Sequence, residues 1–325
     1  MNKKVLIVSF SFEQEQEAFD VLIKAGLKPV LLAEKDRKGF DEEKLIGYIQ
    51  SLDQRPSGII MGADIELSEK FVQSYPELKY ISLNCAGSDH LNLKAFENAG
   101  IQVCNVPRQN FDAVADLVWG LIISLMRNIV IGDKNIRAGK WVEGVARGRA
   151  VSKKTLGIIG FGAIGQAVAK RAIGFEMNVI ASDPIKDYEV AKKYNVTYVE
   201  NDELFKEADI IVPNCPLVPS TYHLINKNTI SIMKDSAVII NASRGGVINT
   251  EDLIEALKNN VIAGAALDAF EKEPLYESEL FNLNNVVLTP HMGGLADREI
   301  RNVAIKSAEN AVILQKNGKT GSELF

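Results

Sequence analysis

The stretch Lys154-Thr-Leu-Gly-Ile-Ile-Gly-Phe-Gly-Ala-Ile-Gly165 organises the rest of this 325-residue sequence. Its first part, residues 155–159, predicts a short β-strand. Gly160, Gly162 and Gly165 follow with the spacing G-x-G-x-x-G. In such a spacing the first glycine permits a tight turn, the second lets the backbone approach a pyrophosphate, and the third lets a helix pack against the sheet. The stretch therefore predicts the phosphate-binding turn of a dinucleotide site.

The residues after the turn support this interpretation. Gln166 to Ile173 predicts a helix, whose N-terminal N–H groups and positive dipole end attract phosphates. A second strand, Asn178 to Ser182, leads to Asp183, where a carboxylate can accept hydrogen bonds from both ribose hydroxyls of NAD. The same carboxylate repels the 2′-phosphate of NADP, so the sequence predicts NAD. The glycine spacing alone also fits a turn without a ligand, but strand, helix and acid in register favour the dinucleotide.

The composition narrows the classes of protein. With 325 residues, the chain is long enough for about two domains with their own cores. Its composition, 46% hydrophobic and 24% charged residues, is typical of globular proteins. A net charge of −5 without a basic block argues against nucleic acid as a partner. The longest apolar run, residues 117–126, is too short to span a bilayer, so no membrane partner is expected. Cys85, Cys104 and Cys215 form no C-x-x-C pair, which predicts a reduced, cytoplasmic protein without a metal site.

Strand-like and helix-like segments alternate along both halves of the chain. Such alternation predicts parallel, doubly wound sheets. In the first half we expect strands at 5–9, 27–32, 58–61, 79–83 and 101–103, and helices at 13–25, 41–52, 68–74 and 93–99. In the second half we expect strands at 155–159, 178–182, 196–199, 210–212, 237–241, 263–267 and 286–288.

Three further segments connect these halves. A long apolar helix from Val114 to about Asn128 is predicted to cross between the domains. The polar residues 137–153 are predicted to form a projecting arm that contacts a second subunit. A last amphipathic helix, residues 296–315, is predicted to return to the first domain.

Chemically reactive residues follow the later strands of the second half. Arg244 follows the strand at 237–241, Glu273 follows the strand at 263–267, and His291 follows the next strand. Ligands of open α/β sheets bind at the carboxyl ends of strands, so these side chains are expected to meet. Singly, each has a simpler interpretation: a surface salt-bridge partner, a solvated acid and a buried imidazole. Their joint position beyond a dinucleotide turn favours a catalytic site.

These three residue types suit hydride transfer next to a carboxylate. Arg244 offers a planar charged fork that can hold the carboxylate or keto oxygen of a 2-oxo acid. His291 can donate a proton to the carbonyl oxygen and remove it in the reverse direction. A neighbouring Glu273 would favour the imidazolium and raise the pKa of His291, which keeps the acid form available near neutral pH.

With these motifs in view, the sequence resembles the D-isomer-specific 2-hydroxyacid dehydrogenase family over essentially its full length. The matching stretches are 156–165, 215–221, 240–246, 264–274 and 289–294. The resemblance implies Arg244, Glu273 and His291 as the catalytic trio of an NAD-dependent oxidoreductase. The implied cofactor-binding positions are Gly160, Gly162, Ala163, Ile164, Gly165, Asp183, Cys215, Thr221, Ala242, Ser243, Arg244, Asp268, His291, Gly293 and Gly294.

The resemblance also assigns roles within that set and a domain plan. The amides of Ala163 and Ile164 are expected to bind the pyrophosphate, and Asp268 to face the nicotinamide carboxamide. The implied fold is α/β, with two doubly wound parallel-sheet domains. A discontinuous flavodoxin-like substrate domain (1–104 and 295–325) accompanies a Rossmann NAD domain (105–294), and a homodimer is built on the crossing region.

The substrate is less well defined than the reaction. Within the family the chain is most similar to short phosphoglycerate dehydrogenases without a regulatory domain, so 3-phosphoglycerate is one expected substrate. Hydroxypyruvate and glyoxylate reductases share the stretch 264–268, so they are the alternative. The substrate loop of the family usually begins with arginine, where Leu83 stands here. The backbone at Ala86, Gly87 and Ser88, together with Arg244 and His291, is expected to bind the substrate.

Two other functions are compatible with the same motifs. The C-terminal-binding co-repressors resemble this family and keep the trio, which makes a dinucleotide-sensing scaffold an alternative. Formate dehydrogenases also resemble it, but they carry Gln where Glu273 stands, so they fit less well.

Overall fold

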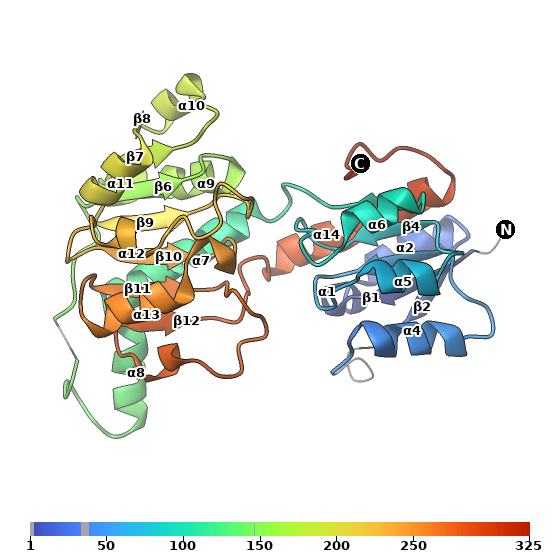
Figure 1. The fold of residues 1–325 in the computed structure, drawn as a ribbon, viewed down its shortest axis with the longest axis horizontal. Helices are drawn as coiled ribbons and strands as arrows, with labels where there is room; N and C mark the ends of the chain where they lie inside the picture. Colours follow the sequence, from blue (N-terminus) through green and yellow to red (C-terminus); the bar gives the residue numbers. More distant parts are fainter. Residues whose placement is uncertain (1–2, 34–38, 146) are drawn as a thin grey trace. The chain divides into compact units, whose positions relative to one another are not determined.

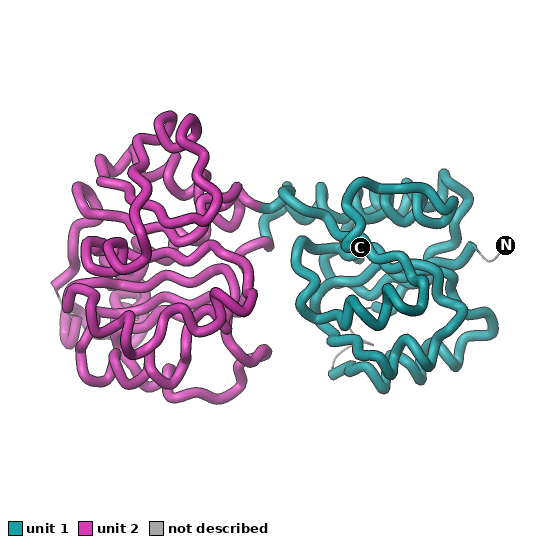
Figure 2. Tube along the Cα trace, turned by 45° about the horizontal axis from the view of Figure 1, so that its top comes forward, with its two compact units in different colours: residues 1–110, 295–325 teal, residues 111–294 magenta. Residues whose placement is uncertain are grey.

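The computed structural model describes residues 3–33, 39–145 and 147–325. The chain divides into two compact units, residues 1–110 with 295–325 and residues 111–294 (Figure 2). Each unit is built around its own parallel β-sheet, with helices on both faces of the sheet (Figure 1). The predicted α/β fold with two doubly wound sheets is therefore confirmed.

The sheet of the first unit has five strands in the order β2-β1-β3-β4-β5, and all their pairings are parallel. This order is that of flavodoxin-like folds. The strands are β1 (Lys4–Val8), β2 (Lys28–Leu31), β3 (Gly58–Met61), β4 (Tyr80–Leu83) and β5 (Gln102–Cys104). The helices are α1 (Phe10–Glu13), α2 (Gln16–Lys24), α4 (Glu42–Ser51), α5 (Glu69–Ser74), α6 (Leu93–Asn98) and α14 (Asp297–Gln315).

Alternation along β1 explains the layers of the first unit. Val5 and Ile7 point to one face, where they pack with residues of α2 and α14. Leu6 and Val8 point to the other face, where they pack with residues of α4, α5 and α6. Because successive side chains of a strand alternate between faces, a strand that is apolar throughout needs cover on both sides.

The sheet of the second unit has seven strands in the order β12-β11-β10-β9-β6-β7-β8. Counted from β6, six of them follow the Rossmann order 3-2-1-4-5-6, and the order reverses between β6 and β9. The strands are β6 (Thr155–Ile159), β7 (Asn178–Ser182), β8 (Val196–Tyr198), β9 (Ile210–Pro213), β10 (Val238–Asn241), β11 (Gly264–Leu267) and β12 (Val286–Leu288).

Two helix layers cover this second sheet. One layer contains α7, α9 and α10, and the other contains α11, α12 and α13. The α-helices are α7 (Phe111–Met126), α8 (Ile129–Arg137), α9 (Ala163–Ala172), α10 (Tyr188–Lys193), α11 (Asn201–Glu207), α12 (Lys227–Ile230) and α13 (Thr250–Lys258). Short 3₁₀ turns are η1 (Ile173–Phe175), η2 (Gly245–Val247) and η3 (Glu279–Asn282).

Several predicted boundaries need correction. The helix predicted at 13–25 begins at Gln16 as α2, and the short helix α1 before it was not predicted; the chain turns at Gln14 and Glu15 between them. The helix predicted from Val114 begins three residues earlier, at Phe111. A second helix, α8, was not predicted; Asn128, with a positive φ of 54°, redirects the chain between α7 and α8.

The segment predicted as an arm, residues 137–153, contains the last residue of α8 and otherwise irregular chain. Residues 138–153 hold no helix or strand among those described, and residue 146 lies outside the described residues. Trp141 and Val142 are 70% and 69% exposed. The segment is bonded to the rest of the second unit at Arg149, whose N–H donates to the Met126 carbonyl and whose guanidinium donates to the Ser236 carbonyl.

The first boundary between the units also differs from the one expected at 104/105. The structure places it at 110/111. Asn105 and Val106 still bond to the first unit, since their N–H groups donate to the carbonyls of Ser322 and Cys85. The predicted final helix, observed as α14, lies in the first unit and packs against α2.

Membrane-spanning potential was checked for the described residues. No single helix among them has the length and apolar composition needed to cross a membrane; only the bent pair of α7 and α8, at 65°, meets that test jointly.

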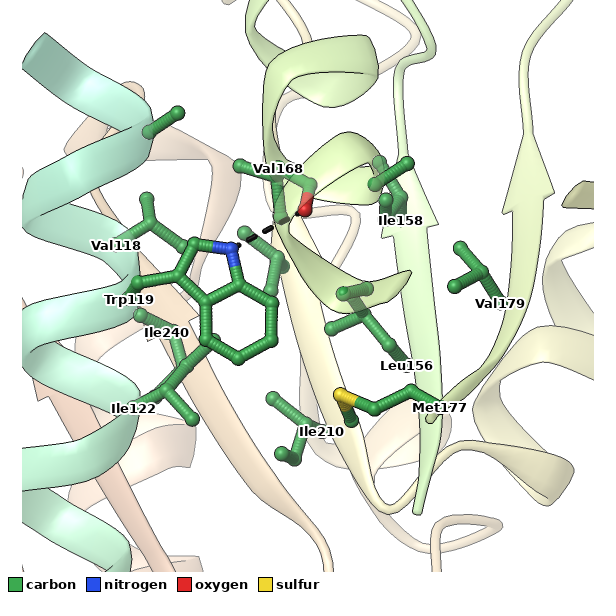
Figure 3. Packing of buried hydrophobic residues seen from close by; sticks show 14 of the residues in the cluster. Val118, Trp119, Ile122, Leu156, Ile158, Val168, Met177, Val179, Ile210 and Ile240 are labelled. Atoms are coloured by element: carbon green, nitrogen blue, oxygen red, sulfur yellow. Dashed lines mark hydrogen bonds between the residues drawn. The ribbon is translucent and has the colours of Figure 1, made fainter. Parts of the chain in front are cut away.

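Trp119 joins α7 to α9, the helix that follows the glycine turn (Figure 3). Its indole N–H donates to the carbonyl of Val168 at 3.1 Å. Its ring stacks on Phe175, with 4.6 Å between the ring centroids. The indole is 5% exposed, so the contact belongs to the core of the second unit.

Replacing Trp119 by Phe should therefore lower the free energy of unfolding by about 1–3 kcal/mol, because it removes buried ring volume and one hydrogen bond. Urea denaturation followed by circular dichroism measures the change. Tyr276→Leu is the control, since that side chain is 85% exposed and should contribute within about 0.5 kcal/mol. Equal losses in both variants would contradict the assignment.

Candidate active site

The glycine turn joins β6 to α9 with very little space around two of its glycines. Gly160 has a φ of +91°, and a Cβ atom there would lie 2.9 Å from the carbonyl carbon of Asn214. A Cβ atom on Gly165 would lie 2.3 Å from the carbonyl oxygen of Gly160. At Gly162, by contrast, an added Cβ meets nothing within 4 Å. Two glycines thus serve the chain's own packing, and the third leaves open space.

That open space lies at the start of a helix. The helix predicted from Gln166 begins at Ala163, with Gly162 as its N-cap and no side chain capping it. Ala163 and Ile164 therefore contribute N–H groups to the first turn, and the first intrahelical bond runs from the Gln166 N–H to the Gly162 carbonyl. Uncapped N–H groups at a positive helix end suit a pyrophosphate.

Asp183 lies at the end of β7, next to this turn. One carboxylate oxygen accepts the N–H of Phe161 at 2.6 Å, and the other accepts the N–H of Ile185 at 2.7 Å. These bonds fix the orientation of the carboxylate, whose remaining lone pairs can accept ribose hydroxyls. Beyond it, the ammonium of Lys186 pairs with Glu200 at 3.1 Å.

Asn214 was missed as a candidate from the sequence. Its Oδ1 atom is buried and has no hydrogen-bond partner within the described part of the chain. It follows β9, at the point where the strand order reverses, which is where dinucleotides bind in such sheets. A buried, unsatisfied oxygen at this place fits a polar group of a bound cofactor, so the residues present fit NAD. Its position directly after a strand was the available signal.

Three other predicted cofactor residues have side chains that are buried or hydrogen-bonded within the protein. Burial raises the pKa of the Cys215 thiol to about 11, so the thiol is neutral and only its backbone is available for polar contacts. The hydroxyl of Thr221 donates to the carbonyl of Pro216 at 2.6 Å and so closes the loop after β9. Ser243 is buried, and its hydroxyl and N–H both donate to Asn241.

Asp268 holds the loop that carries His291. Its side chain is 1% exposed, and its two oxygens accept the Thr289 hydroxyl at 2.6 Å and the N–H groups of Met292 and Gly293 at 2.9 Å each. His291 itself has a φ of +51°, an unfavourable conformation for a side chain of its size. The carboxylate bonds on both sides of His291 are the physical reason that this conformation is kept.

His291 and Glu273 form a direct pair. Nδ1 of His291 lies 2.7 Å from one Glu273 oxygen, and the other oxygen accepts the N–H of Phe270 at 2.9 Å. The Glu273 hydrogen bond raises the pKa of His291; burial opposes it, the charges of Glu273 and Asp268 add to it, and Arg244 lowers it. Burial acts to raise the pKa of Glu273, but the bonds from His291 and Phe270 outweigh burial and lower it.

Arg244 is brought to the same edge of the sheet. The turn after it is packed against the loop of Glu273, since a Cβ atom on Gly245 would lie 1.8 Å from the carbonyl carbon of Phe270. The carbonyl of Arg244 accepts the side chain of Asn241 at 2.9 Å, which orients the turn. Its positive charge acts on the pKa of both Glu273 and His291. The structure thus assembles the three predicted side chains within the second unit.

The predicted substrate loop belongs to the first unit. The carbonyl of Ala86 accepts the side chain of Asn105 at 2.7 Å, and that of Ser88 accepts the N–H of Leu91 at 3.0 Å. The thiol of Cys85 donates to the carbonyl of Gly87 at 3.2 Å. With the carbonyl groups so oriented, the loop has a defined conformation in the first unit.

Comparison with known proteins identifies this arrangement. The model of the D-isomer specific 2-hydroxyacid dehydrogenase NAD-binding domain matches residues 119–293. The chain belongs to the D-isomer specific 2-hydroxyacid dehydrogenase family. It is 36% identical to a glyoxylate reductase of Pyrococcus horikoshii over 288 residues, which cover 86% of this chain and 85% of that one. It is 38% identical to a glyoxylate reductase of Thermococcus litoralis over 289 residues, 87% and 86% of the two chains.

A solved structure of the family extends the likeness to three dimensions. D-lactate dehydrogenase from Aquifex aeolicus, complexed with NAD and lactic acid, is similar with a TM-score of 0.84 and 25% identity, over 98% of each chain. The protein is accordingly an NAD-dependent D-2-hydroxyacid oxidoreductase, as the motifs predicted.

Gly162→Ala tests the open space at the helix start. Since the added methyl meets no atom of the described residues within 4 Å, the free energy of unfolding should stay within about 0.5 kcal/mol of the parent. The methyl would occupy the space into which a pyrophosphate must come, so NAD affinity should fall roughly tenfold or more, ~1.4 kcal/mol. Isothermal titration calorimetry measures the affinity.

The matched control is Gly174→Ala, at another glycine whose added Cβ meets nothing within 4 Å. That variant should bind NAD as the parent does. An unchanged dissociation constant in Gly162→Ala would show that the cofactor does not approach this turn.

Proposed function

We propose that the protein reduces a small 2-oxo acid to the D-2-hydroxy acid with NADH, and that Arg244, Glu273 and His291 are its catalytic residues. The observation that carries the proposal is the 2.7 Å bond between His291 Nδ1 and Glu273, beside the charge of Arg244. A carboxylate on Nδ1 leaves Nε2 as the nitrogen that exchanges a proton with substrate. Bound NADH supplies the hydride.

Each residue of the trio has a separate task. Arg244 binds the carboxylate or keto oxygen of the 2-oxo acid and polarises the carbonyl with its fixed positive charge. His291, held as the acid form by Glu273, donates its Nε2 proton to the carbonyl oxygen. In the oxidation direction the neutral imidazole accepts that proton. Asp268 has the supporting task of keeping His291 in place through the loop that it anchors.

The substrate that we favour is glyoxylate or hydroxypyruvate. Relatives that match most of the chain are named glyoxylate reductases. The residues after β3, Met61-Gly-Ala-Asp64, include no basic side chain that could hold a phosphate group, so 3-phosphoglycerate is the less favoured substrate.

The remaining assignments follow the same proposal. The first unit would be the substrate domain, with the backbone of Ala86, Gly87 and Ser88 binding the substrate carboxylate, and the second unit the NAD domain. A homodimer in the cytoplasm would cover the apolar side chains that α8 and the following segment expose. These are Ile129, Ile136, Trp141 and Val142.

The test is an NADH-oxidation screen across glyoxylate, hydroxypyruvate, phosphohydroxypyruvate and pyruvate. We expect the highest kcat/KM with glyoxylate or hydroxypyruvate. His291→Ala should lower kcat by roughly two to four decades, the range for a general acid–base residue, with NADH affinity retained. If no 2-oxo acid were reduced while NADH still bound, the dinucleotide-sensing scaffold would become the better interpretation.

The raised pKa of His291 has a consequence for the pH profile. Reduction requires the protonated imidazole, so its rate should be constant at low pH and fall as pH rises through that raised pKa. Glu273→Gln removes the charge that raises the pKa of His291, so the falling limb of kcat should move to lower pH.

Glu277→Gln serves as the control for this shift, because it changes the net charge equally on the same exposed segment. The falling limb of its kcat–pH profile should coincide with that of the parent protein. If the falling limb of the kcat–pH profile did not move in Glu273→Gln, Glu273 would not be the group that raises the pKa of His291.

A further inference from the structure

The loop that carries Glu273 contains a second carboxylate, Glu271, which is bonded to a second histidine. Nε2 of His223 forms a hydrogen bond with one oxygen of Glu271. The other oxygen of Glu271 accepts the N–H of Thr250, the first residue of α13, at 3.2 Å. Glu271 is therefore held from two sides, by an imidazole and by the positive end of a helix.

The other nitrogen of His223 defines its tautomer. Nδ1 of His223 lies 3.3 Å from the side-chain amide nitrogen of Asn249. Asn249 is the N-cap of α13, and its side-chain oxygen accepts the N–H of Asp252 at 3.1 Å. Because that cap commits the amide oxygen to the helix, the amide nitrogen must face His223 as a donor, so Nδ1 must accept. The imidazole is then neutral and carries its proton on Nε2, directed at Glu271.

The backbone of His223 is bonded to the turn that carries Arg244. The N–H of His223 donates to the carbonyl of Gly246 at 2.8 Å, and that of Ile225 donates to the carbonyl of Val247 at 3.0 Å. One residue thus joins the turn after Arg244 to the loop before Glu273. Tyr222 covers the imidazole face, with 3.9 Å between the ring centroids.

We propose that His223 is a positioning residue, which acts as a neutral Nε2–H donor to Glu271 and so sets the placement of Glu273 relative to Arg244 and His291. The inference rests on the proposed function for its effect on catalysis. Glu271 and Glu273 are two residues apart, so displacement of Glu271 moves the partner of His291 as well. His223 touches neither cofactor nor substrate in this role; its effect reaches the reaction through the loop.

The direct test is NMR of the imidazole groups, which is simple because the chain has three histidines. In the parent protein at neutral pH, ¹⁵N-correlated spectra should show His223 as the neutral Nε2–H tautomer. An Nδ1–H tautomer or an imidazolium at His223 would overturn the proposal. The same spectra give the pKa of His291 without any substrate.

Variants separate positioning from simple folding. His223→Leu removes the donor, so Glu273 should be less well held and the pKa of His291 should fall, by less than in Glu273→Gln. His223→Gln keeps an N–H donor near the same place, so the pKa of His291 should stay close to that of the parent protein. A folded His223→Leu protein in which the pKa of His291 is unchanged would refute the proposal. The control is Glu255→Gln on α13, which removes a charge from the exposed ion pair of Glu255 with Lys227. It should leave the pKa of His291 unchanged.

Kinetics distinguish this inference from the proposed function. In His223→Leu, kcat for 2-oxo acid reduction should fall roughly ten- to hundredfold, as expected for a small misplacement of catalytic groups, while NADH affinity is unchanged. If the parent protein reduced no 2-oxo acid, the proposed function would fail, whereas the NMR result on His223 would still stand. If the parent were active and His223→Leu were equally active, only the positioning role would fail.

Discussion

The parallel register of β10, β11 and β12 is the constraint on which the candidate active site depends. Asn241 pairs with Leu267, and Leu267 pairs with Leu288, so these strands end level with one another. The residues that follow them therefore emerge side by side although they are far apart in sequence. Arg244, Asp268 and the loop of His291 are neighbours for this reason alone, and a strand shifted by one residue would turn its terminal side chain to the other face.

Level strand ends bring the residues close together, and aspartates at the strand ends then fix their geometry through hydrogen bonds. Asp268 is almost fully buried, and a charge in that position is tolerated because three donors from the next loop satisfy it. The same bonds hold His291 in a left-handed conformation. At the predicted dinucleotide site, the carboxylate of Asp183 likewise accepts the N–H groups of Phe161 in the glycine turn and of Ile185 after β7. In both places an aspartate at a strand end organises the adjacent loop before it meets any ligand.

The loop after β11 combines two histidine–glutamate pairs with opposite requirements. In the pair of Glu273 and His291, the carboxylate raises the pKa of the imidazole, which suits a proton donor. In the pair of Glu271 and His223, the cap of α13 demands an accepting Nδ1, which suits a neutral ring. The difference comes from the third group at each pair rather than from the pair itself, so two glutamates of one short loop can bind a reactive imidazole and a structural one.

The sequence by itself determined the class of fold, the cofactor and the three catalytic candidates, because these depend on local patterns. Apolar runs, glycine spacing and the residue that follows each strand are all readable within short windows. Tertiary structure decided what depends on contacts between remote segments. The start of α9 at Ala163, the Asn214 oxygen that has no partner among the described residues, and the bond between His223 and Glu271 arise where separate segments meet. No periodicity along the chain records such a meeting.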